Sequence, residues 1–499
     1  MNRRSFLASS AAAGLAACAT AAPRSTGWTL AGEVDAAVAR AMALNMTPGL
    51  AVAVYTREGV YARGFGVTDV STSAPADADT AFYIASSTKP LTSLALVALH
   101  QRGAFNLDST LAAYAPNAPF PAAVGADQTT FRQMLSHTSG IDNGPIGFRV
   151  AFSGQHDPET LWRLLAESTV NAEAPRGRFD YTNVGYNITT VLSDHRLGVA
   201  WQDLLDREVF GPAGMARASA RMSRAAGWSV AKPHALNGDG AVARIYLEKT
   251  DQTMQSAGGV IMSANDAARW LELMLTQGRV GRRQILAPEI IEAMKTPIAE
   301  VQAEFDGYRR EAYALGWYHG PYRDQRLLHH FGGFAGFRAH VSFMPAVGVG
   351  VAVFANGNQG GAATDAVANY VYDRVLSADD ASQRFDAALA DGAQRRARSV
   401  SAITTDRANR AGRQWTLTRA REAYAGAYEN DAWGRIEVTA DGDALRLRFG
   451  AMQATAEPFT QPNSIRVELV PGQGEPVLFE GDGEHPVALR TRTGRFQRV

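Results

Sequence analysis

A run of apolar residues from Leu91 to Leu99 predicts a helix that is buried on nearly every side. Such a helix lies in the middle of a core, so the chain must place other layers of structure around it. The segment directly before it, Phe82–Lys89, puts Ser86 and Lys89 three residues apart at the start of this helix. Positions i and i+3 lie side by side on a helix, so the lysine can reach the serine hydroxyl. A serine hydroxyl is a poor nucleophile until it has such a partner.

Lysine is scarce in this chain, and its scarcity bears on how Lys89 is interpreted. The four lysines are Lys89, Lys232, Lys249 and Lys295, and arginine carries nearly all the other positive charge. Arginine stays protonated under practically all conditions, whereas a buried lysine can lose its proton and act as a base. A second Ser-x-x-Lys pattern, Ser229 to Lys232, is followed by Pro233 and by no helical pattern. Taken alone, Ser86 and Lys89 fit either a catalytic pair or a serine beside an ordinary surface lysine.

The residues from 28 to 378 begin and end with strand-like segments and are helical in between. Gly49–Tyr55 and Val60–Val67 predict a β-hairpin, and further strands are expected between Tyr313 and Asn356, the first of them at Tyr313–His319. This order predicts one antiparallel sheet built from both ends of the segment, flanked by helices and with an inserted all-α subdomain. The expected fold class is therefore α+β, in the form of an α/β sandwich.

The chain is 499 residues long, which is long for one domain, and its composition changes after residue 378. Residues 379–414 are rich in alanine, arginine and aspartate and predict a helical linker. Residues 415–499 contain short strand-like segments at regular spacing, which predict a small β-barrel or sandwich. The formal net charge is zero, so bulk electrostatics give no reason to expect a nucleic-acid partner.

The N-terminal residues 1–23 have the features of an export signal. Arg3 and Arg4 precede an alanine-rich stretch that is too short to span a bilayer, a pattern typical of the twin-arginine route. Cys18, the single cysteine, excludes an internal disulfide and a cysteine-based metal site. Leu15–Cys18 resembles a lipoprotein box, which predicts lipidation of Cys18 and a periplasmic protein held to the membrane by a lipid anchor only. Ordinary cleavage after Ala19–Ala21 is the alternative.

Tyr181 and Asn183 stand at the start of an expected helix in the middle region. They lie on one side of the chain, so both side chains can point into one cleft. A tyrosine beside a lysine ammonium has its phenolate form favoured, because an opposite charge stabilises the ionised group. The alternative is a packed aromatic residue with an asparagine in a turn.

The stretch Leu328–Phe337 joins two expected strands and contains His330, Gly332 and Gly333. Adjacent glycines beside a strand indicate close approach of a ligand or another backbone. A backbone N–H here can form half of an oxyanion hole, with the N–H of Ser86 as the other half. A β-bulge next to a core histidine is the alternative.

In order and spacing, Ser86-x-x-Lys89, Tyr181-x-Asn183 and His330-x-Gly332 resemble the three motifs of the serine penicillin-recognising hydrolases. The similarity is to the branch that holds class C β-lactamases, DD-peptidases, D-aminopeptidases and related esterases. It covers roughly residues 32 to 376, and three motifs in order make it specific. The tail resembles the small β domain that is often appended to such hydrolases.

The resemblance implies a role for each motif residue. Ser86 is similar to the acylated nucleophile, and Lys89 and Tyr181 to the pair that transfers the proton; which of them accepts it first is left open. Asn183 would hold the lysine or the acyl group, and Gly333 would donate the second oxyanion N–H. His330 takes a place often held by lysine. The resemblance implies no metal and no cofactor.

One departure from the family pattern concerns the substrate. His330 and Phe331 stand where β-lactam-handling members often carry Lys and Thr, which bind the substrate carboxylate. A histidine is only partly protonated near neutral pH and phenylalanine offers no donor. A neutral ester or a D-amino-acid amide is therefore as well supported as a β-lactam. We expect specificity to lie in two loops, 144–158 and 299–311.

Two hypotheses follow for the function. The first is a serine hydrolase that acts through an acyl-enzyme on a small ester, peptide or β-lactam. The second is an envelope-tethered sensor or binding protein for peptidoglycan fragments or β-lactams, with weak or no turnover. The sequence leaves the substrate, the role of the tail and the oligomeric state open.

Overall fold

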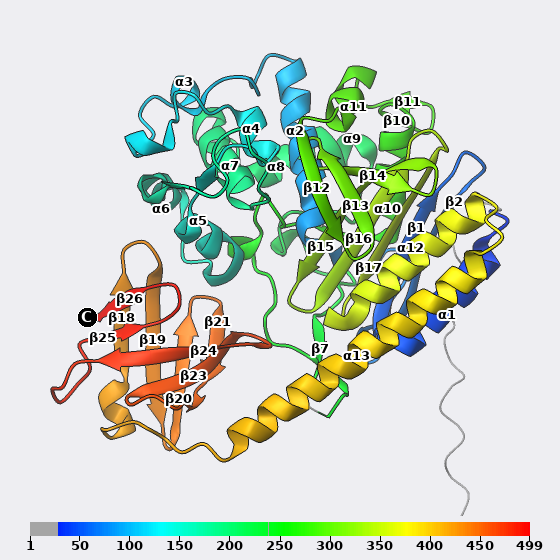
Figure 1. The fold of residues 1–499 in the computed structure, drawn as a ribbon. Helices are drawn as coiled ribbons and strands as arrows, with labels where there is room; N and C mark the ends of the chain where they lie inside the picture. Colours follow the sequence, from blue (N-terminus) through cyan, green and yellow to red (C-terminus); the bar gives the residue numbers. More distant parts are fainter. Residues whose placement is uncertain (1–27, 238) are drawn as a thin grey trace, which may run out of the picture.

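The computed structural model describes residues 28–237 and 239–499 (Figure 1). The expected export signal and Cys18 lie outside the described residues. Within them, no helix combines the length and the apolar character needed to cross a membrane.

A nine-stranded antiparallel sheet forms the centre of the larger part of the molecule. Its strands, in spatial order, are β12 (Ala299–Phe305), β13 (Tyr308–Tyr313), β14 (Tyr318–Tyr322), β15 (Gln325–Phe334), β16 (Phe337–Met344), β17 (Val349–Ala355), β1 (Gly49–Tyr55), β2 (Val60–Asp69) and β3 (Ala74–Pro75). The first strand of the chain pairs with the last of this segment, with Val52 opposite Val353. The prediction of a sheet built from both ends of the segment is confirmed.

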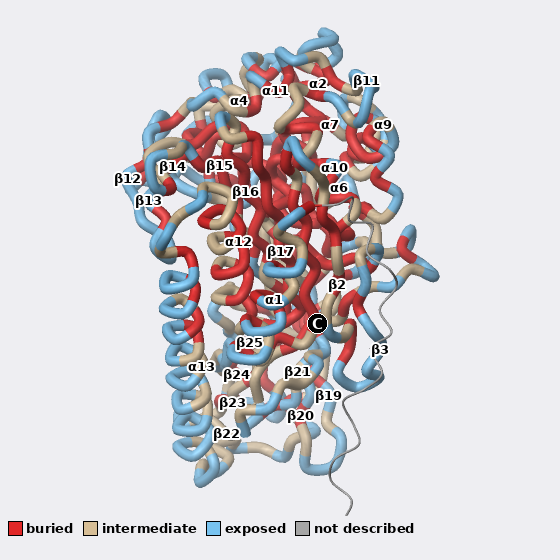
Figure 2. The backbone as a smooth tube through the Cα atoms, turned by 90° about the vertical axis from the view of Figure 1, so that its right-hand side faces the viewer, coloured by how far each residue is buried: buried red, intermediate tan, exposed pale blue. Residues whose placement is uncertain are grey.

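Both faces of this sheet are covered by helices, which explains the nearly continuous apolar character of its central strands. On β1, Leu50, Val52 and Val54 pack with α1 (Ala31–Asn45) and α12 (Gly361–Val375). The alternate residues Ala51 and Ala53 pack on the opposite face with α2 (Lys89–Gln101) and α10 (Ala264–Leu275). Figure 2 shows the resulting buried layer running through the middle of the molecule.

Helix α2 lies inside the core, as its apolar sequence predicts. Every residue from Lys89 to Leu99 is buried. A short 3₁₀ turn, η1 (Ala85–Thr88), leads into it, and Pro90 fits its first turn because the proline nitrogen there needs no partner. Ser86 and Lys89 are therefore held at the point where the chain enters the core.

An irregular helical region is inserted between β3 and the second half of the sheet. Its helices are α3 (Leu111–Tyr114), α4 (Phe131–Leu135), α5 (Gly144–Phe148), α6 (Pro158–Arg163), α7 (Val184–Leu197), α8 (Trp201–Leu205) and α9 (Gly211–Ala213), and α11 (Pro288–Lys295) follows α10. Four two-stranded ribbons interrupt this half: β4 (Phe82–Tyr83) with β9 (Ile261–Met262), β5 (Ile141–Asp142) with β6 (Thr169–Val170), β7 (His234–Leu236) with β8 (Val242–Arg244), and β10 (Arg279–Val280) with β11 (Arg283–Gln284). The predicted α+β class with an inserted helical region is confirmed.

Two boundaries differ from expectation. The segment 299–311 is not a loop, because it forms the β12–β13 hairpin at the sheet edge; its polar residues face solvent there and hide the strand pattern. The segment expected to be one strand from Tyr313 to His319 is broken, since β13 ends at Tyr313 and β14 begins at Tyr318. Gly316 makes the turn between them with a φ of +93°, a conformation that glycine adopts at low cost.

A 31-residue helix, α13 (Ala381–Ala411), leads to the C-terminal domain. Only its first turns are buried, by Ala381, Phe385, Leu389 and Gly392, and the remainder is largely solvent-exposed (Figure 2). The C-terminal strands form one nearly closed, barrel-like sheet around a core of aromatic and aliphatic residues. In chain order they are β18 (Gly426–Asn430), β19 (Gly434–Asp441), β20 (Ala444–Phe449), β21 (Met452–Thr455), β22 (Glu457–Pro458), β23 (Ser464–Val470), β24 (Gln473–Glu480), β25 (Ala488–Arg490) and β26 (Arg495–Arg498).

The C-terminal domain packs against the inserted helical region (Figure 1). Arg149 donates to the carbonyl oxygens of Asp431 and Ala432 at 2.9 and 2.8 Å. The N–H of Ala451 donates to Ser153 O at 2.8 Å, and a Cβ on the neighbouring Gly450 would clash with that oxygen. These contacts hold the C-terminal domain beside the pocket that contains Ser86.

Candidate active site

Ser86 lies in the turn η1 at the floor of a large pocket. The residue before it, Ala85, has a φ of +46°, which is in the left-handed region that alanine rarely adopts. Backbone strain of this kind persists only where the surrounding structure holds it in place. Here the buried side chains of Ser87 and Thr88 hold the turn: Ser87 Oγ donates to His330 O at 2.9 Å, and Thr88 Oγ1 accepts from the N–H of Val260 at 3.0 Å.

Lys89 is completely buried beside Ser86. Its Nζ lies 3.2 Å from Ser86 Oγ, 2.7 Å from Asn183 Oδ1 and 2.8 Å from Ala257 O. In the described part of the chain, no carboxylate lies within ion-pair distance of Nζ, and burial holds the pKa of Lys89 well below its ordinary value. A neutral amine has two N–H donors and one lone pair. In that neutral form the two amide oxygens can accept both donors, which leaves the lone pair for the Ser86 hydroxyl.

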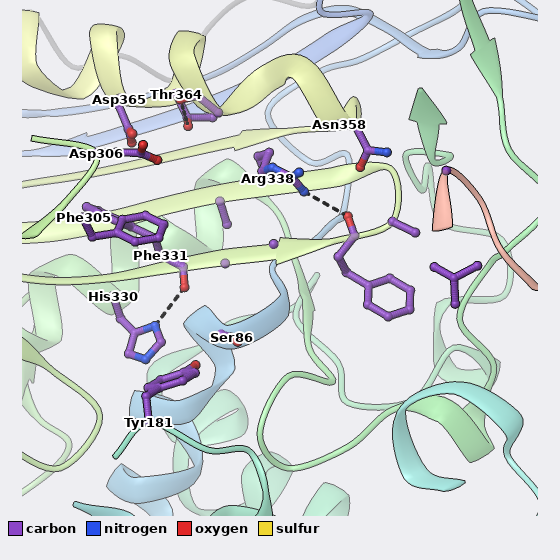
Figure 3. Close-up of a pocket in the computed structure, with 18 of the residues that line it drawn as sticks. Ser86, Tyr181, Phe305, Asp306, His330, Phe331, Arg338, Asn358, Thr364 and Asp365 are labelled. Atoms are coloured by element: carbon purple, nitrogen blue, oxygen red, sulfur yellow. Dashed lines mark hydrogen bonds between the residues drawn. The ribbon is translucent and has the colours of Figure 1, made fainter. Parts of the chain in front are cut away.

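Tyr181 lies over the same pair, with its ring centroid 4.8 Å from Lys89 Nζ. Its hydroxyl end points towards Ser86, while the side chain keeps 38% of its surface exposed (Figure 3). Burial raises the pKa of Tyr181, and its contact with the Ser86 side chain acts in the opposite direction but is smaller. The expectation that a lysine ammonium favours the phenolate is therefore not met. Burial therefore disfavours the charged form of both groups.

Asn183 directly precedes α7, so its distance from Lys89 is set by that helix. His137 supports the same segment from below. It accepts a hydrogen bond from the N–H of Thr182 at its Nδ1, 3.3 Å away, and its ring centroid lies 4.6 Å from that of Tyr181. The stretch Leu135–Gly140 also resembles the family in sequence, but that resemblance assigns no role to His137. Its role as a positioning residue was missed for that reason.

His330 lies on β15 and borders the pocket beside Tyr181, with the two ring centroids 6.0 Å apart (Figure 3). Its Nδ1 lies 2.9 Å from the carbonyl oxygen of Phe331, so Nδ1 carries the proton and Nε2 is left as an acceptor. Nε2 is buried and makes no hydrogen bond to any described residue. Burial, and next the charge of Lys89, lower the pKa of His330 well below its ordinary value. His330 therefore presents an acceptor at a position where β-lactam-handling members of the resembled family often carry a lysine.

Gly332 and Gly333 lie on β15, where the sequence predicted either a close approach of other backbone or a β-bulge. A Cβ on Gly332 would lie 2.1 Å from the carbonyl oxygen of Ile84, so only glycine fits between β15 and the turn that carries Ser86. Gly333 pairs with Arg338 across the β15–β16 ladder and also borders the pocket. The close approach expected from the paired glycines is present. The assignment of Gly333 and Ser86 N–H groups as an oxyanion hole stays a prediction.

The pocket around Ser86 has a volume of 930 Å³ and is lined by several segments that lie far apart in the sequence. Ser86 and Tyr181 form its floor, and strand β15 forms one wall. The β12–β13 hairpin contributes Phe305, Asp306 and Arg310. The turn between β23 and β24, residues 470–473 of the C-terminal domain, closes the far side. Across residues 28–237 and 239–499, no cluster of three or more His, Cys, Asp or Glu side chains is placed to hold a metal ion.

The sequence of this chain matches a known protein family. The family model described as Beta-lactamase matches residues 34–375, which is most of the chain. The chain belongs to the Beta-lactamase family.

Two relatives are similar to this chain in sequence, and three solved structures are similar to it in fold. The chain is 26% identical over 487 residues to the unguisins hydrolase ungD of Aspergillus violaceofuscus, covering 87% of this chain and 82% of that protein. It is 22% identical over 329 residues to the protein flp of Staphylococcus aureus, covering 65% of this chain and 63% of flp.

The solved structures are similar in fold. An octameric penicillin-binding protein homologue from Pyrococcus abyssi superposes with a TM-score of 0.58 at 20% identity, over 93% of this chain and 99% of that one. A D-amino acid amidase from Ochrobactrum anthropi gives 0.55 at 20% identity, over 70% and 99%. The D-alanine carboxypeptidase AmpC from Burkholderia cenocepacia gives 0.52 at 21% identity, over 66% and 95%.

This member of the Beta-lactamase family also carries two pocket residues that its motifs do not reveal. Arg310 stacks on Tyr318 with its guanidinium carbon 3.9 Å from the ring centroid, and its Nε donates to His329 at 3.2 Å. Arg338 donates to the carbonyl oxygens of Phe334 and Phe337 at 3.2 and 2.8 Å. Among the described residues, neither arginine forms an ion pair, although Asp306 and Asp365 also border the pocket. No sequence signal marks these arginines among the many others in the chain.

The second Ser-x-x-Lys pattern is structural. Lys232 forms an ion pair with Glu248 at 2.8 Å, and Ser229 Oγ lies 2.9 Å from Thr80 Oγ1. The partner of Lys232 is therefore a carboxylate, and the Ser229 hydroxyl faces a threonine hydroxyl. Its interpretation as unrelated to catalysis agrees with this environment.

Proposed function

We propose that this protein is a serine hydrolase that works through an acyl-enzyme on an ester or amide. The observation that carries the proposal is the environment of Lys89. A buried lysine without a carboxylate partner places its lone pair on a serine hydroxyl, and this is the arrangement that a general base needs.

The site supports the following steps. Ser86 Oγ bonds to the substrate carbonyl carbon as its proton passes to Lys89 Nζ, and the carbonyl oxygen becomes an oxyanion. Collapse of this intermediate breaks the bond to the leaving nitrogen or oxygen, which takes the proton of the Tyr181 hydroxyl; Lys89 returns its extra proton to Tyr181. Water then attacks the acyl carbon, passes a proton to Lys89 and releases the acid. Ser86 finally recovers its proton from Lys89.

The assignment of Lys89 rather than Tyr181 as first base rests on the direction of their pKa values. Burial lowers the pKa of Lys89, which makes the neutral amine available as an acceptor. Burial raises the pKa of Tyr181, which keeps its proton on the phenol and suits it to donate. His330, whose Nε2 is buried and has no described hydrogen-bond partner, also lines this pocket, and we propose that Nε2 accepts a substrate N–H.

For the substrate we propose a peptide amide that carries a free carboxylate. Two observations support this: the neutral acceptor His330, and the two arginines Arg310 and Arg338, whose guanidinium groups have no carboxylate partner within the described chain. The names of similar proteins, among them an unguisins hydrolase, a D-amino acid amidase and a D-alanine carboxypeptidase, suggest that peptides with D-residues should be tested first.

A fluorophosphonate probe tests the proposed chemistry. We expect stoichiometric labelling of the wild type and none of Ser86→Ala. Equal labelling of both proteins, or no labelling of either, would contradict the proposal. Labelling without turnover of any acyl substrate would favour the alternative of an envelope-tethered binding protein.

A substrate panel then tests the proposed specificity. It contains a p-nitrophenyl ester, a chromogenic cephalosporin, and D- and L-configured dipeptides with a free or an amidated C-terminus. We expect Arg310→Gln to lower kcat/KM for the free acids by about tenfold or more, because a charge-assisted hydrogen bond is lost. The amidated peptides serve as the control and should change little. An equal loss on both would show that Arg310 acts on the fold of the pocket and does not bind carboxylate.

We also propose that the chain is exported and lipidated at Cys18. Mass spectrometry of the protein from its native membrane fraction tests this. A diacylglyceryl-modified N-terminal cysteine is expected, and a mature N-terminus at Ala22 would contradict it.

A further inference from the structure

A second cavity lies on the other side of α7 from the Ser86 pocket, where the chain turns from α7 into α8. Its volume is 330 Å³, and none of the pocket residues around Ser86 borders it. Most of its wall is hydrocarbon, contributed by Val150, Pro158, Leu161, Val191, Val199, Ala200, Trp201 and Met254. Nothing in the proposed chemistry uses this cavity.

The charge of the cavity wall is negative. Asp194 and Asp251 both line it, and no lysine or arginine is among its described lining residues. Asp194 accepts a hydrogen bond from the N–H of Trp201 at 3.1 Å, and no cationic group of the described chain lies within ion-pair distance of its carboxylate. Burial raises the pKa of Asp194 to about 7, against smaller opposing effects of the Trp201 N–H and of Arg221.

The other titratable side chains of the wall are two histidines. His156 and His195 also line the cavity. The imidazole of His156 lies 2.7 Å from the carbonyl oxygen of Gln252, and burial lowers its pKa, so it stays neutral. The ring of His195 stacks on Trp162 with centroids 3.9 Å apart. Just outside, Arg221 is engaged by Asp203.

The inner wall of this cavity is shared with the catalytic lysine. Asn187 lines the cavity one turn along α7 from Asn183, and Asn183 accepts from Lys89. Ser256 lines it directly before Ala257, whose carbonyl is the other acceptor of Lys89. Asn187 and Ser256 contact each other at 3.3 Å. Anything that fills the cavity therefore touches the two segments that hold Lys89 in place.

We propose that this cavity is an effector site that binds a small organic cation, an ammonium group on an apolar body, and that its occupancy changes the rate at which Ser86 is acylated. The ammonium group pairs with the carboxylate of Asp194, and the apolar body fills the space beside Val191 and Met254. An anion is excluded by Asp194 and Asp251, and a neutral molecule of the same shape gains only the apolar contacts.

The first test is calorimetric titration with 2-phenylethylamine, compared with 2-phenylethanol and phenylacetate, on the Ser86→Ala protein. Its readout does not depend on hydrolysis, so a failure of the proposed function would leave it intact. We expect the amine to bind about tenfold or more tightly than the alcohol, because a charged hydrogen bond replaces a neutral one. No binding, or equal binding of amine and alcohol, would overturn the proposal.

Two variants locate the binding. Asp194→Asn keeps an acceptor for the N–H of Trp201 and removes the charge, so the amine should bind about tenfold or more weakly. Val191→Phe fills the cavity and should abolish binding. Glu159→Gln, which removes an exposed carboxylate of α6 outside the cavity, is the matched control and should bind as before. Unchanged affinity in both Asp194→Asn and Val191→Phe would overturn the site.

The second test measures the rate of fluorophosphonate labelling of Ser86 with the cavity saturated by the amine. We expect a change of about fivefold in the wild type, in the range typical of coupled sites. Val191→Phe should show no such change at the same amine concentration, which controls for reaction of the amine with the probe. Binding without any change in the labelling rate would overturn the effector role.

Discussion

Two of the four lysines, Lys89 and Lys249, are buried without a carboxylate, and they sit on two sides of the same pocket. Burial lowers the pKa of both well below the ordinary value. Lys249 donates to the carbonyl oxygens of Ala151 and Thr253 at 2.7 and 3.3 Å, and its Nζ lies 3.6 Å from the ring centroid of Phe334. Lys89 also has two oxygen acceptors, but its third neighbour is the hydroxyl of Ser86.

The difference shows that a lowered pKa is not enough to make a base. In both places the chain hides an amine from water, and in both the amine is satisfied by oxygen acceptors. Only at Lys89 does the remaining direction face a hydroxyl proton; at Lys249 it faces an aromatic ring. Lys249 ties the segment before η7 (Asp251–Thr253) to the β15–β16 turn, and we interpret it as a structural residue of the pocket rim.

The largest expected effect is the difference between substituting Lys89 and substituting Lys249. Lys89→Met should lower the rate of Ser86 labelling by about 10²- to 10⁴-fold, the usual contribution of a general base. Lys249→Met should stay within about threefold of the wild type, because no hydroxyl proton faces Lys249. Time courses of labelling, quenched at set intervals, measure the labelling rate of both variants. A comparable loss in both would mean that burial of an amine anywhere around the pocket governs reactivity.

The tyrosine beside each lysine gives the next largest effect. Tyr181→Phe should slow turnover by about 10²-fold, since the proton donor to the leaving group is lost. Tyr83 lies beside Lys249, with its ring centroid 5.3 Å from Nζ, and its hydroxyl donates to Gly258 O. Tyr83→Phe should therefore leave turnover largely unchanged. Steady-state kcat with the best ester or amide of the panel is the measurement, and equal losses would refute the role of Tyr181.

The pH dependence of labelling sharpens the assignment of Lys89. The reactive form is the neutral amine, so the labelling rate should be full above the pKa of Lys89 and fall as the pH drops through it. Because burial lowers this pKa well below 10.5, the rate should already be constant on the alkaline side of neutrality. A labelling profile between about pH 5 and pH 10 tests this, and a rate still rising at the upper limit would show an ordinary lysine.

The smallest expected effect concerns stability. Lys249→Met leaves the carbonyl oxygen of Ala151 buried without a donor, which should cost about 1–3 kcal/mol of unfolding free energy. Lys232→Met is the control: it removes a half-exposed ion pair with Glu248, worth about 0–1 kcal/mol. Urea unfolding of both variants measures the difference. A larger loss at Lys232 would contradict the structural role given to Lys249.

Much of the fold follows from local patterns that the sequence displays. The apolar run after Lys89 predicts a buried helix because each of its faces is hydrophobic, and the structure places every face in the core. The strands at both ends of residues 28–378 predict a sheet closed by its termini, which the pairing of β1 with β17 confirms. The hairpin 299–311 was missed, because edge strands carry polar residues that resemble a loop.

Part of the candidate site was likewise predictable from the sequence, and part was not. Spacing on one helix turn brings Lys89 to Ser86, and three ordered motifs identify the companions Tyr181, Asn183 and His330. The direction of the pKa of Tyr181 could not be obtained from sequence, because it depends on how much water the folded pocket excludes. Arg310 and the turn 470–473 reach the pocket from segments with no motif, so only the folded chain reveals them.

By itself the sequence predicted the fold class and brought Ser86 next to Lys89, because both follow from spacing and periodicity within short segments. The tertiary structure alone decided that Lys89 is buried away from every described carboxylate while Lys232 pairs with Glu248. The sequence places a serine three residues before each of these lysines. What separates them is the distance to a carboxylate and the exclusion of water, and both arise only when distant parts of the chain pack together.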